Sequence, residues 1–387
     1  MAGGANDGRG RTPSSQEVVG HIEAGPDGTR GAAVAPPVEQ PELLTAWQLI
    51  SQARGCQVMG SPLYAHLLMT AAQDVVSGGP VADLLVPRAR PDRGDAAGLR
   101  LMAAVHRLVL TRRAPRLAMH YPSVGGSPDL VSAGADFLEA VAEHGEDLAR
   151  DVERPCQTNE VGRAAGLVVG LLEVAGTTGL PLALHEVGAA AGLNLRMDAW
   201  RYELPGGLVT GDPDGEVVLS GRWRGPLPHA DAPLRVVDRR GCDLLPIDPT
   251  TPDGRLALSA SVWADQPHRF ERLGAALRTA ARIPAVVDRA TTSVWVREHV
   301  APTPGHATVL YHSIVEEYLP TEELTAFHEA VEEAATTATE DAPLAWIRME
   351  PSSELRHHSV SLRLWPHAPD LRHLATTGAH GDDVVPL

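Results

Sequence analysis

The chain has 387 residues, a mass of 41.0 kDa and a formal net charge of −16. All 33 basic residues are arginine, which excludes pyridoxal-phosphate Schiff bases, phosphate-loop lysines and Ser-Lys nucleophile pairs. The acidic excess argues against nucleic-acid binding, and we recognise neither a secretion signal nor a membrane-spanning run. With three widely separated cysteines, we expect a cytoplasmic protein.

The N-terminal part of the chain is expected to be a disordered tail followed by a helical domain. Residues 1–40 are rich in Gly, Pro, Ser, Asp and Arg and show little periodicity. From 41 to 154, apolar residues recur at spacings of three and four, which predicts helices. One helix is expected to begin at Ser61-Pro62 with Ser61 as its N-cap, and another to fill 130–153.

Residues 155–387 have the pattern of an α/β domain. A buried helix is expected at 158–174, and from Leu182 onward short apolar runs alternate with helical stretches, which is typical of a parallel sheet. We expect about seven strands, with a glycine-rich insertion at about 202–230 and a C-terminal β-hairpin. The expected strands are 182–186, 234–238, 285–288, 307–312, 344–349, 360–365 and 371–376.

The segment from Leu184 to Leu195 carries the strongest functional signal. A strand ends in Glu186, and Gly188 and Gly192 precede a predicted helix, so the backbone can turn sharply and approach a ligand. The pattern lacks the middle glycine of the dinucleotide fingerprint. It resembles instead the first motif of class I S-adenosylmethionine (SAM)-dependent methyltransferases. That resemblance implies cofactor binding by Glu186, Gly188, Ala189, Gly192 and Asn194.

A second resemblance covers residues 47 to 380. The strings S-P-L-Y, H-Y-P-S-V-G-G, Q-T-N-E-V-G-R-A, A-G-L-N-L, R-R-G-C-D-L, V-W-A-D-Q and H-S-I-V-E-E-Y-L occur in this order. They resemble the bacterial domain of unknown function family 2332, whose members are thought to be methyltransferase-like. The resemblance therefore implies a Rossmann-like sheet of the class I methyltransferase type, but no substrate.

Two residue types near the loop suggest further ligand contacts. Asparagine occurs only three times, and both Asn159 and Asn194 flank the proposed cofactor loop; helix capping is the alternative for Asn159. Asp238 is expected to end the second strand, where methyltransferases of this class hold the ribose hydroxyls. Asp243 is a rival for the same task.

Catalytic residues are expected at the carboxyl ends of the strands. His312 closes the fourth expected strand and could act as a general base, or it could simply cap the next helix. Asn159 and Glu160 open the buried helix before the first strand, and Tyr121 could contribute a wall from the helical domain. Asp265 and Gln266 either reach the pocket or begin a helix. No metal site is expected.

The sequence therefore predicts an α/β class I methyltransferase-like Rossmann domain with an N-terminal all-helical domain as a lid. We expect a SAM-binding enzyme that transfers a methyl group to a small molecule, mainly by positioning the reactants. Two alternatives stay open: an NAD- or FAD-dependent oxidoreductase on a related sheet, and a non-catalytic protein that keeps the fold for binding. The oligomeric state is left open.

Overall fold

The computed structural model of the protein describes residues 40–89, 96–154, 157–352 and 357–387, and apart from residue 40 the expected tail lies outside these ranges. The chain divides into two compact units. Unit 1 contains the helices before Cys156 together with Ala260–Pro267, and unit 2 contains Gln157–Ser259 and His268–Leu387. The expected domain boundaries did not include the segment Ala260–Pro267 in the helical part.

Unit 1 is all-helical in the part of the chain that the structure describes. Its apolar core gathers from every α-helix of the unit that the structure describes, and the short α6 contributes one fully buried residue, Leu117. The expected helix at 130–153 is interrupted at His144, which ends one helix and precedes the next. The helices are α2 (Pro41–Val58), α3 (Pro62–Ser77), α4 (Pro80–Leu85), α5 (Ala97–Leu110), α6 (Pro115–Ala118), α7 (Leu130–Glu143) and α8 (Gly145–Asp151).

The inserted segment Ala260–Pro267 completes unit 1. Trp263 and Ala264 are part of its hydrophobic core. Asp265 accepts hydrogen bonds from the Ser61 hydroxyl at 2.5 Å and from the Leu63 backbone N–H at 2.9 Å. The carboxylate of Asp265 therefore caps α3, a role that we had expected of Ser61, because it satisfies a backbone donor that has no partner within the first turn.

Unit 2 is built on an eight-stranded sheet of order β11-β10-β9-β8-β7-β1-β5-β6. Five neighbouring strands of this sheet, β6, β5, β1, β7 and β8, run parallel to one another. The strands β9, β10 and β11 continue the sheet, each antiparallel to its neighbour. The strands are β1 (Leu182–Val187), β5 (Val236–Asp243), β6 (Val286–Arg289), β7 (Ala307–Ser313), β8 (Leu344–Pro351), β9 (His358–Trp365), β10 (Ala368–Thr377) and β11 (Val385–Pro386). The chain order reverses between β1 and β7, which is the switch point where ligands bind in open α/β sheets.

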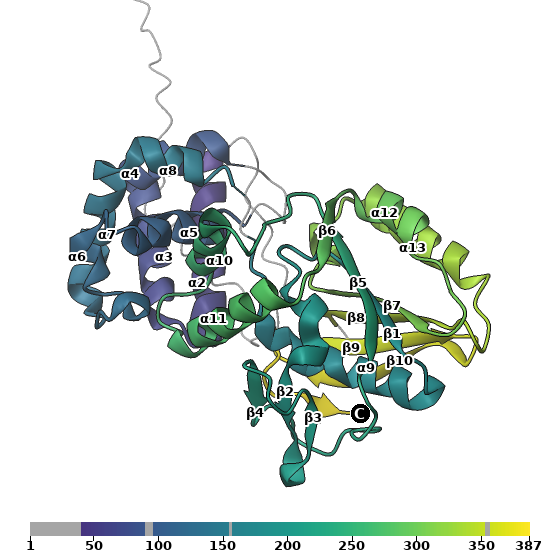
Figure 1. Ribbon diagram of the computed structural model, residues 1–387. Helices are drawn as coiled ribbons and strands as arrows, with labels where there is room; N and C mark the ends of the chain where they lie inside the picture. Colours follow the sequence, from purple (N-terminus) through teal and green to yellow (C-terminus); the bar gives the residue numbers. More distant parts are fainter. Residues whose placement is uncertain (1–39, 90–95, 155–156, 353–356) are drawn as a thin grey trace, which may run out of the picture. The chain divides into compact units, whose positions relative to one another are not determined.

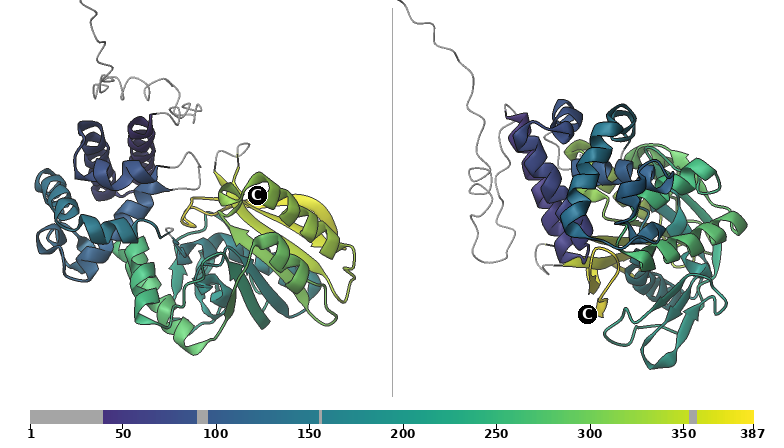
Figure 2. Two further views of the ribbon diagram at one scale, coloured as in Figure 1. Left: turned by 90° about the horizontal axis from the view of Figure 1, so that it is seen from above. Right: turned by 90° about the vertical axis from the view of Figure 1, so that its left-hand side faces the viewer.

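Helices cover both faces of this sheet. The expected buried helix begins with a 3-10 turn, η4 (Val161–Arg163), and continues as α9 (Ala164–Thr178), which packs on β7, β8, β9 and β10. On the other face, α12 (Thr292–His299) and α13 (Thr321–Ala335) lie side by side (Figures 1 and 2). Leu310 and Trp346 are part of the apolar core that these helices cover. Successive side chains of a strand point to opposite sides of the sheet, so neighbouring residues of one strand contact different layers of helices.

The connections of unit 2 carry the remaining elements. The expected insertion forms a three-stranded sheet of β2 (Arg201–Glu203), β3 (Val209–Gly211) and β4 (Val218–Ser220). Two helices, α10 (Pro252–Ser261) and α11 (Pro267–Arg282), lie between β5 and β6 in the chain. Residues Val161–Thr178 are long and apolar enough to cross a membrane, but 72% of this stretch is buried inside the protein. We therefore assign it as a core helix.

Candidate functional site

The glycine loop after β1 turns at three positions with positive φ. Gly188 has φ 66°, Ala190 has φ 50° and Gly192 has φ 63°. A Cβ on Gly188 would lie 2.5 Å from Cγ2 of Val315, and one on Gly192 would lie 2.8 Å from Cγ2 of Val287. Both glycines are therefore required by the backbone and by the close approach of neighbouring side chains.

The segment after this loop differs from the expected helix. It is a 3-10 helix, η5 (Leu193–Ala199), with a kink at Arg196. The Arg196 guanidinium explains the kink, because it donates to the carbonyl oxygens of Gly192 and Ile283 and so binds its own segment to the chain after α11. The loop is therefore not followed by a regular α-helix N-terminus of the kind that binds anions.

Glu186 lies at the carboxyl end of β1, on the face of the sheet that Tyr311 shares. The two residues are register partners on adjacent parallel strands, so their side chains emerge on the same side. Glu186 is 2% exposed. Among the residues that the structure describes, Glu186 Oε2, Asn194 Oδ1 and the Tyr311 hydroxyl have no hydrogen-bond partner. Buried polar atoms without partners are rare, so this group is the strongest indication of a ligand or water site in unit 2.

The protonation state of Glu186 follows from this burial. Burial raises the pKa of Glu186 to about 8, against the opposing effects of polar contacts from the Asn194 and Tyr311 side chains and of the Arg196 charge. The Asp243 carboxylate raises it further. The Glu186 carboxyl is therefore mostly neutral at pH 7, and a positive charge placed beside it would favour its ionised form.

The expectation that Asp238 ends its strand is wrong. β5 continues to Asp243, and Asp238 lies exposed near the start of the strand, opposite Ala183. Asp243 occupies the carboxyl end instead. Its Oδ2 accepts from the Ala190 N–H at 2.9 Å, and its Oδ1 accepts from the Gln157 side chain at 2.7 Å. Of the two acids, only Asp243 touches the glycine loop.

Asn159 and Glu160 hold the same loop from the start of α9. Asn159 Oδ1 accepts from the Leu193 N–H at 2.8 Å, so Asn159 caps η5. The side chain of Asn194 donates to the Glu160 carbonyl at 3.4 Å. Asn159, Glu160 and Asn194 are thus brought together beside Glu186, as the sequence led us to expect, although Asn159 and Glu160 act there by positioning the chain.

The Glu160 carboxylate is part of a buried ion pair. It is 2.6 Å from Nη2 of Arg269 and accepts the Gly162 N–H at 2.9 Å. Burial alone would raise the pKa of Glu160, but the charges of Arg269 and Arg272, joined by His380 at the low pH where that imidazole is protonated, hold it far below its ordinary value. A carboxylate held in this way is permanently ionised and fully engaged, so Glu160 is not suited to proton transfer.

His312 does not face the site, and its predicted role as a general base is not supported. It follows Tyr311 along β7, so its side chain enters the opposite face, where it packs edge-to-face with Phe327. His312 is 0% exposed, donates through Nδ1 to Glu350 at 2.7 Å and accepts the Trp346 indole N–H at 3.1 Å. Both ring nitrogens are therefore occupied, and His312 belongs to the core under α13.

Tyr121 lies in the core of unit 1 and is 0% exposed. Its ring packs against those of Tyr64 and His106 at centroid distances of 6.4 and 5.4 Å. Within the described part of the chain its hydroxyl has no hydrogen-bond partner. Tyr121 is thus an interior aromatic residue of its own unit, and its expected part in a shared pocket stays a prediction.

Two participants were missed by the sequence analysis. Tyr311 contributes an unpartnered hydroxyl, and Arg269 holds Glu160. Tyr311 could have been found from the alternation of β7, because a strand residue adjacent to His312 must face the other side. Arg269 carries no such signal, since 108 residues of chain separate it from Glu160 and the two meet only because α11 places Arg269 beside that carboxylate.

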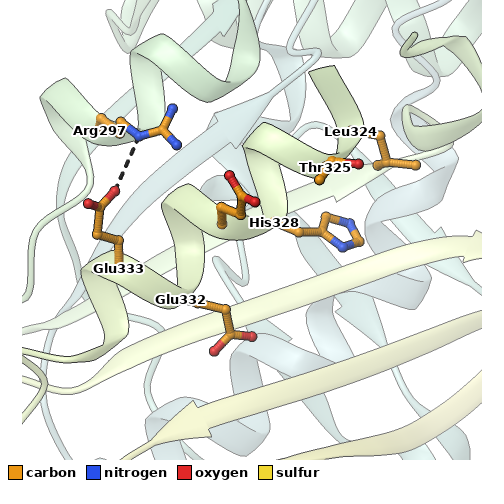
Figure 3. A pocket seen from close by; sticks show the side chains of 7 residues that line it. Arg297, Leu324, Thr325, His328, Glu332 and Glu333 are labelled. Atoms are coloured by element: carbon orange, nitrogen blue, oxygen red, sulfur yellow. Dashed lines mark hydrogen bonds and ion pairs between the residues drawn. The ribbon is translucent and has the colours of Figure 1, made fainter. Parts of the chain in front are cut away.

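A hollow of about 640 Å³ lies on the α12–α13 face, away from this group of residues (Figure 3). It is lined by Arg297, Leu324, Thr325, His328, Glu329, Glu332 and Glu333. Arg297 and Glu333 are already paired across it at 3.2 Å. In the described chain, no group of three or more His, Cys, Asp or Glu residues is arranged to hold a metal ion.

The comparisons with known proteins show the family and no activity. Residues 46–385 match the model of a family described as uncharacterised proteins conserved in bacteria, domain of unknown function 2332. Because the match spans most of the chain, the protein belongs to this family. No curated protein and no solved structure matches it significantly. What the site does must therefore be argued from its chemistry.

Proposed function

We propose that this member of the bacterial domain of unknown function family 2332 binds SAM in unit 2 and transfers its methyl group to a small molecule. The observation that carries the proposal is the group formed by Glu186, Asn194 and Tyr311 at the switch point of the sheet. Each has a buried polar atom without a partner among the described residues. A ligand with donors and a positive charge would satisfy all three.

The raised pKa of Glu186 favours a cationic ligand. With a pKa of about 8, this carboxyl is neutral at pH 7 and becomes a counter-ion only when a cation approaches. SAM carries both an ammonium and a sulfonium group. By contrast, the phosphates of NAD or FAD would bring negative charge to a loop that already holds two carboxyl groups, Glu186 and Asp243.

The other residues of the loop supply complementary contacts. Oδ2 of Asp243 accepts one hydrogen bond, which leaves it a lone pair for a ligand hydroxyl. Val315 covers Gly188, and the neighbouring Ile314 has φ 55°, a conformation that strains a β-branched residue. We therefore expect ligand entry to displace Val315 and to relax this turn.

When bound, SAM supplies an electrophilic methyl group, so the chain needs to position an acceptor rather than to activate one covalently. Glu186 would orient the cofactor, and Asn159 and Asp243 would hold the loop in shape. His312 plays no part in the reaction under this proposal. For the acceptor of the methyl group, the proposal specifies only that it is a small molecule.

Titration calorimetry of the full-length protein with SAM, S-adenosylhomocysteine, NADH and FAD tests the proposal. We expect SAM to bind and to release about 0.9 proton at pH 7, because a carboxyl with a pKa near 8 loses its proton beside a cation. The proton count follows from repeating the titration in buffers of different ionisation enthalpy. Glu186→Gln should abolish proton release and weaken SAM binding by about tenfold or more.

The matched control is Glu340→Gln, an exposed glutamate in the turn before β8, which should bind SAM as the unmodified protein does. Binding of NADH or FAD without binding of SAM or S-adenosylhomocysteine would identify an oxidoreductase and overturn the proposal. If SAM binds equally to Glu186→Gln and with no proton release, the cofactor lies elsewhere in the protein.

A further inference from the structure

The turn that covers the glycine loop of unit 2 is strained. β7 ends at Ser313, and the next residue, Ile314, has φ 55°, a conformation that a β-branched residue rarely adopts. Val315 follows, and its Cγ2 atom lies 2.5 Å from the place where a Cβ on Gly188 would be. Because a strained turn persists only where its surroundings hold it, other contacts must fix Ile314 and Val315.

Both ends of this turn are anchored. Before it, the Arg163 guanidinium donates to the Ser313 carbonyl oxygen at 2.8 Å. After it, the chain forms a 3-10 turn, η7 (Glu316–Tyr318), and an ion pair of 2.9 Å between Glu316 and Arg348 holds this turn. The strained pair of residues between these anchors can therefore change its conformation without displacing the strand or the 3-10 turn.

A buried carboxylate holds the strained pair in place. Glu350, at the carboxyl end of β8, is 6% exposed. Its Oε1 atom accepts the Val315 N–H at 2.9 Å and the His312 Nδ1–H at 2.7 Å. His312 is fixed in turn by the Trp346 indole N–H at 3.1 Å. These hydrogen bonds run from the core under α13 to the edge of the sheet, so Glu350 positions the backbone that covers Gly188.

The position of Glu350 is costly, which argues that it does more than fill the core. Its second oxygen, Oε2, is buried and has no hydrogen-bond partner among the residues that the structure describes. Its charge is balanced in part by Arg163, which interacts with it electrostatically. Unsatisfied buried oxygens are rare, and strained backbone concentrates at ligand clamps and switches. The two features together indicate a turn that is built to open.

We infer that Glu350 is a positioning residue that latches Val315 over Gly188, and that a ligand of the glycine loop must break this latch to enter. The closed turn occupies the place beside Gly188 where a ligand would approach the backbone. A ligand therefore binds only the fraction of molecules whose turn is open, and its apparent affinity is reduced by that fraction. The inference rests on the proposed function for the choice of SAM as ligand, but not for the latch itself.

The experiment measures the latch with and without ligand on the full-length protein. Amide hydrogen exchange, followed by mass spectrometry with fragmentation to single residues, reports how often the Val315 N–H leaves Glu350. Titration calorimetry gives the dissociation constant of SAM. The first variant, Glu350→Gln, keeps the shape of the side chain and loses its charge. The second, Val315→Ala, keeps the N–H and removes the Cγ2 atom beside Gly188.

The matched control is Glu323→Gln. Glu323 also accepts a backbone N–H, that of Ser293 at 2.8 Å, but it joins α13 to the start of α12. This substitution should speed exchange at Ser293 and leave both exchange at Val315 and SAM binding unchanged. It thus shows that the assay detects the loss of a charged acceptor and that the effect stays local.

We expect Glu350→Gln to speed exchange at Val315 by about fivefold or more, because a charged acceptor forms the stronger hydrogen bond. The dissociation constant of SAM should fall by a similar factor, since the turn is open in more of the molecules. Loss of a merely structural contact would instead weaken SAM binding or leave it unchanged. Val315→Ala should tighten SAM binding while the N–H of residue 315 stays protected.

Unchanged exchange at Val315 in Glu350→Gln would overturn the latch, and faster exchange without tighter SAM binding would overturn its control of ligand entry. If SAM binds none of these proteins, the proposed function fails and ligand entry with it, while the exchange rates still decide whether Glu350 holds the turn. Val315→Ala carries the test should Glu350→Gln fail to fold, because shortening a cover that controls entry must increase the affinity for SAM.

Discussion

Replacement of Glu186 by glutamine should change how the stability of the protein depends on pH. In the folded state the pKa of Glu186 is raised from 4.5 to about 8 by burial. Between these values the unfolded chain has lost the proton and the folded chain has kept it. The folded state then binds more protons than the unfolded state, so stability falls as pH rises from about 4.5 to about 8.

The size of the effect follows from the difference in proton affinity. Each pKa unit, a tenfold change in proton affinity, corresponds to about 1.4 kcal/mol. The rise in the pKa of Glu186 from 4.5 to about 8 therefore lowers the free energy of unfolding by about 5 kcal/mol once Glu186 is ionised. Glutamine has nearly the same shape as the neutral carboxyl and cannot ionise. The variant should therefore match the unmodified protein near pH 4.5 and become more stable than it toward pH 9.

Urea unfolding followed by circular dichroism at a series of pH values measures this difference. The same series on Glu340→Gln, an exposed position, provides the control and should run parallel to the unmodified protein. The reasoning would be refuted if Glu186→Gln also ran parallel between pH 5 and pH 9. Such a result would mean that Glu186 is hydrated or paired in solution and that its burial imposes no charge penalty.

Three further substitutions test other parts of unit 2. Glu160→Gln leaves Arg269 buried without its carboxylate and should cost about 3–5 kcal/mol, seen as a melting temperature lower by about 6–20 °C; a loss below about 1 kcal/mol would contradict the buried ion pair. Gly188→Val places a β-branched residue at φ 66° against Val315 and should lower the melting temperature by itself, whereas unchanged melting would show that the loop can move aside. The pKa of Glu316 is lowered to about 2, although burial opposes this, chiefly by a hydrogen bond from His328, so its stabilising contribution is present above pH 4.5 and lost as pH falls toward 2. Glu316→Gln should therefore cost about 1–2 kcal/mol at pH 6 after allowance for solvent screening, and a difference that persisted at pH 2 in denaturant titrations would count against this assignment.

The sequence alone determined where most of the main strands lie along the chain. The expected strands coincide with β1 and with β6 to β10, with small differences at their ends, whereas β5 ends five residues later than expected. This is because a strand buried between two layers of helices needs a short apolar run bounded by turn residues, and that pattern is local. The C-terminal hairpin of β9 and β10 and the insertion after the glycine loop were predictable for the same reason.

The glycine loop and the position of Glu186 were also readable from the sequence, since a strand followed by glycines specifies its own turn. The face on which each side chain emerges was not. One residue of offset along β7 separates Tyr311, at the candidate site, from His312, inside the core. The expected second strand also ended five residues too early, so Asp238 was predicted at the strand end that Asp243 occupies.

Only the tertiary structure decided which distant residues meet. Asp265 caps α3 across about 200 residues of sequence, and Arg269 and Arg272 reach Glu160 from another helix. No repeating pattern in the sequence predicts either contact, because an ion pair or a helix cap between two elements depends on the distance between them and not on the residue pattern within either. The electrostatic character of unit 2, a neutral carboxyl beside a loop and a buried carboxylate held by two arginines, was therefore set by packing.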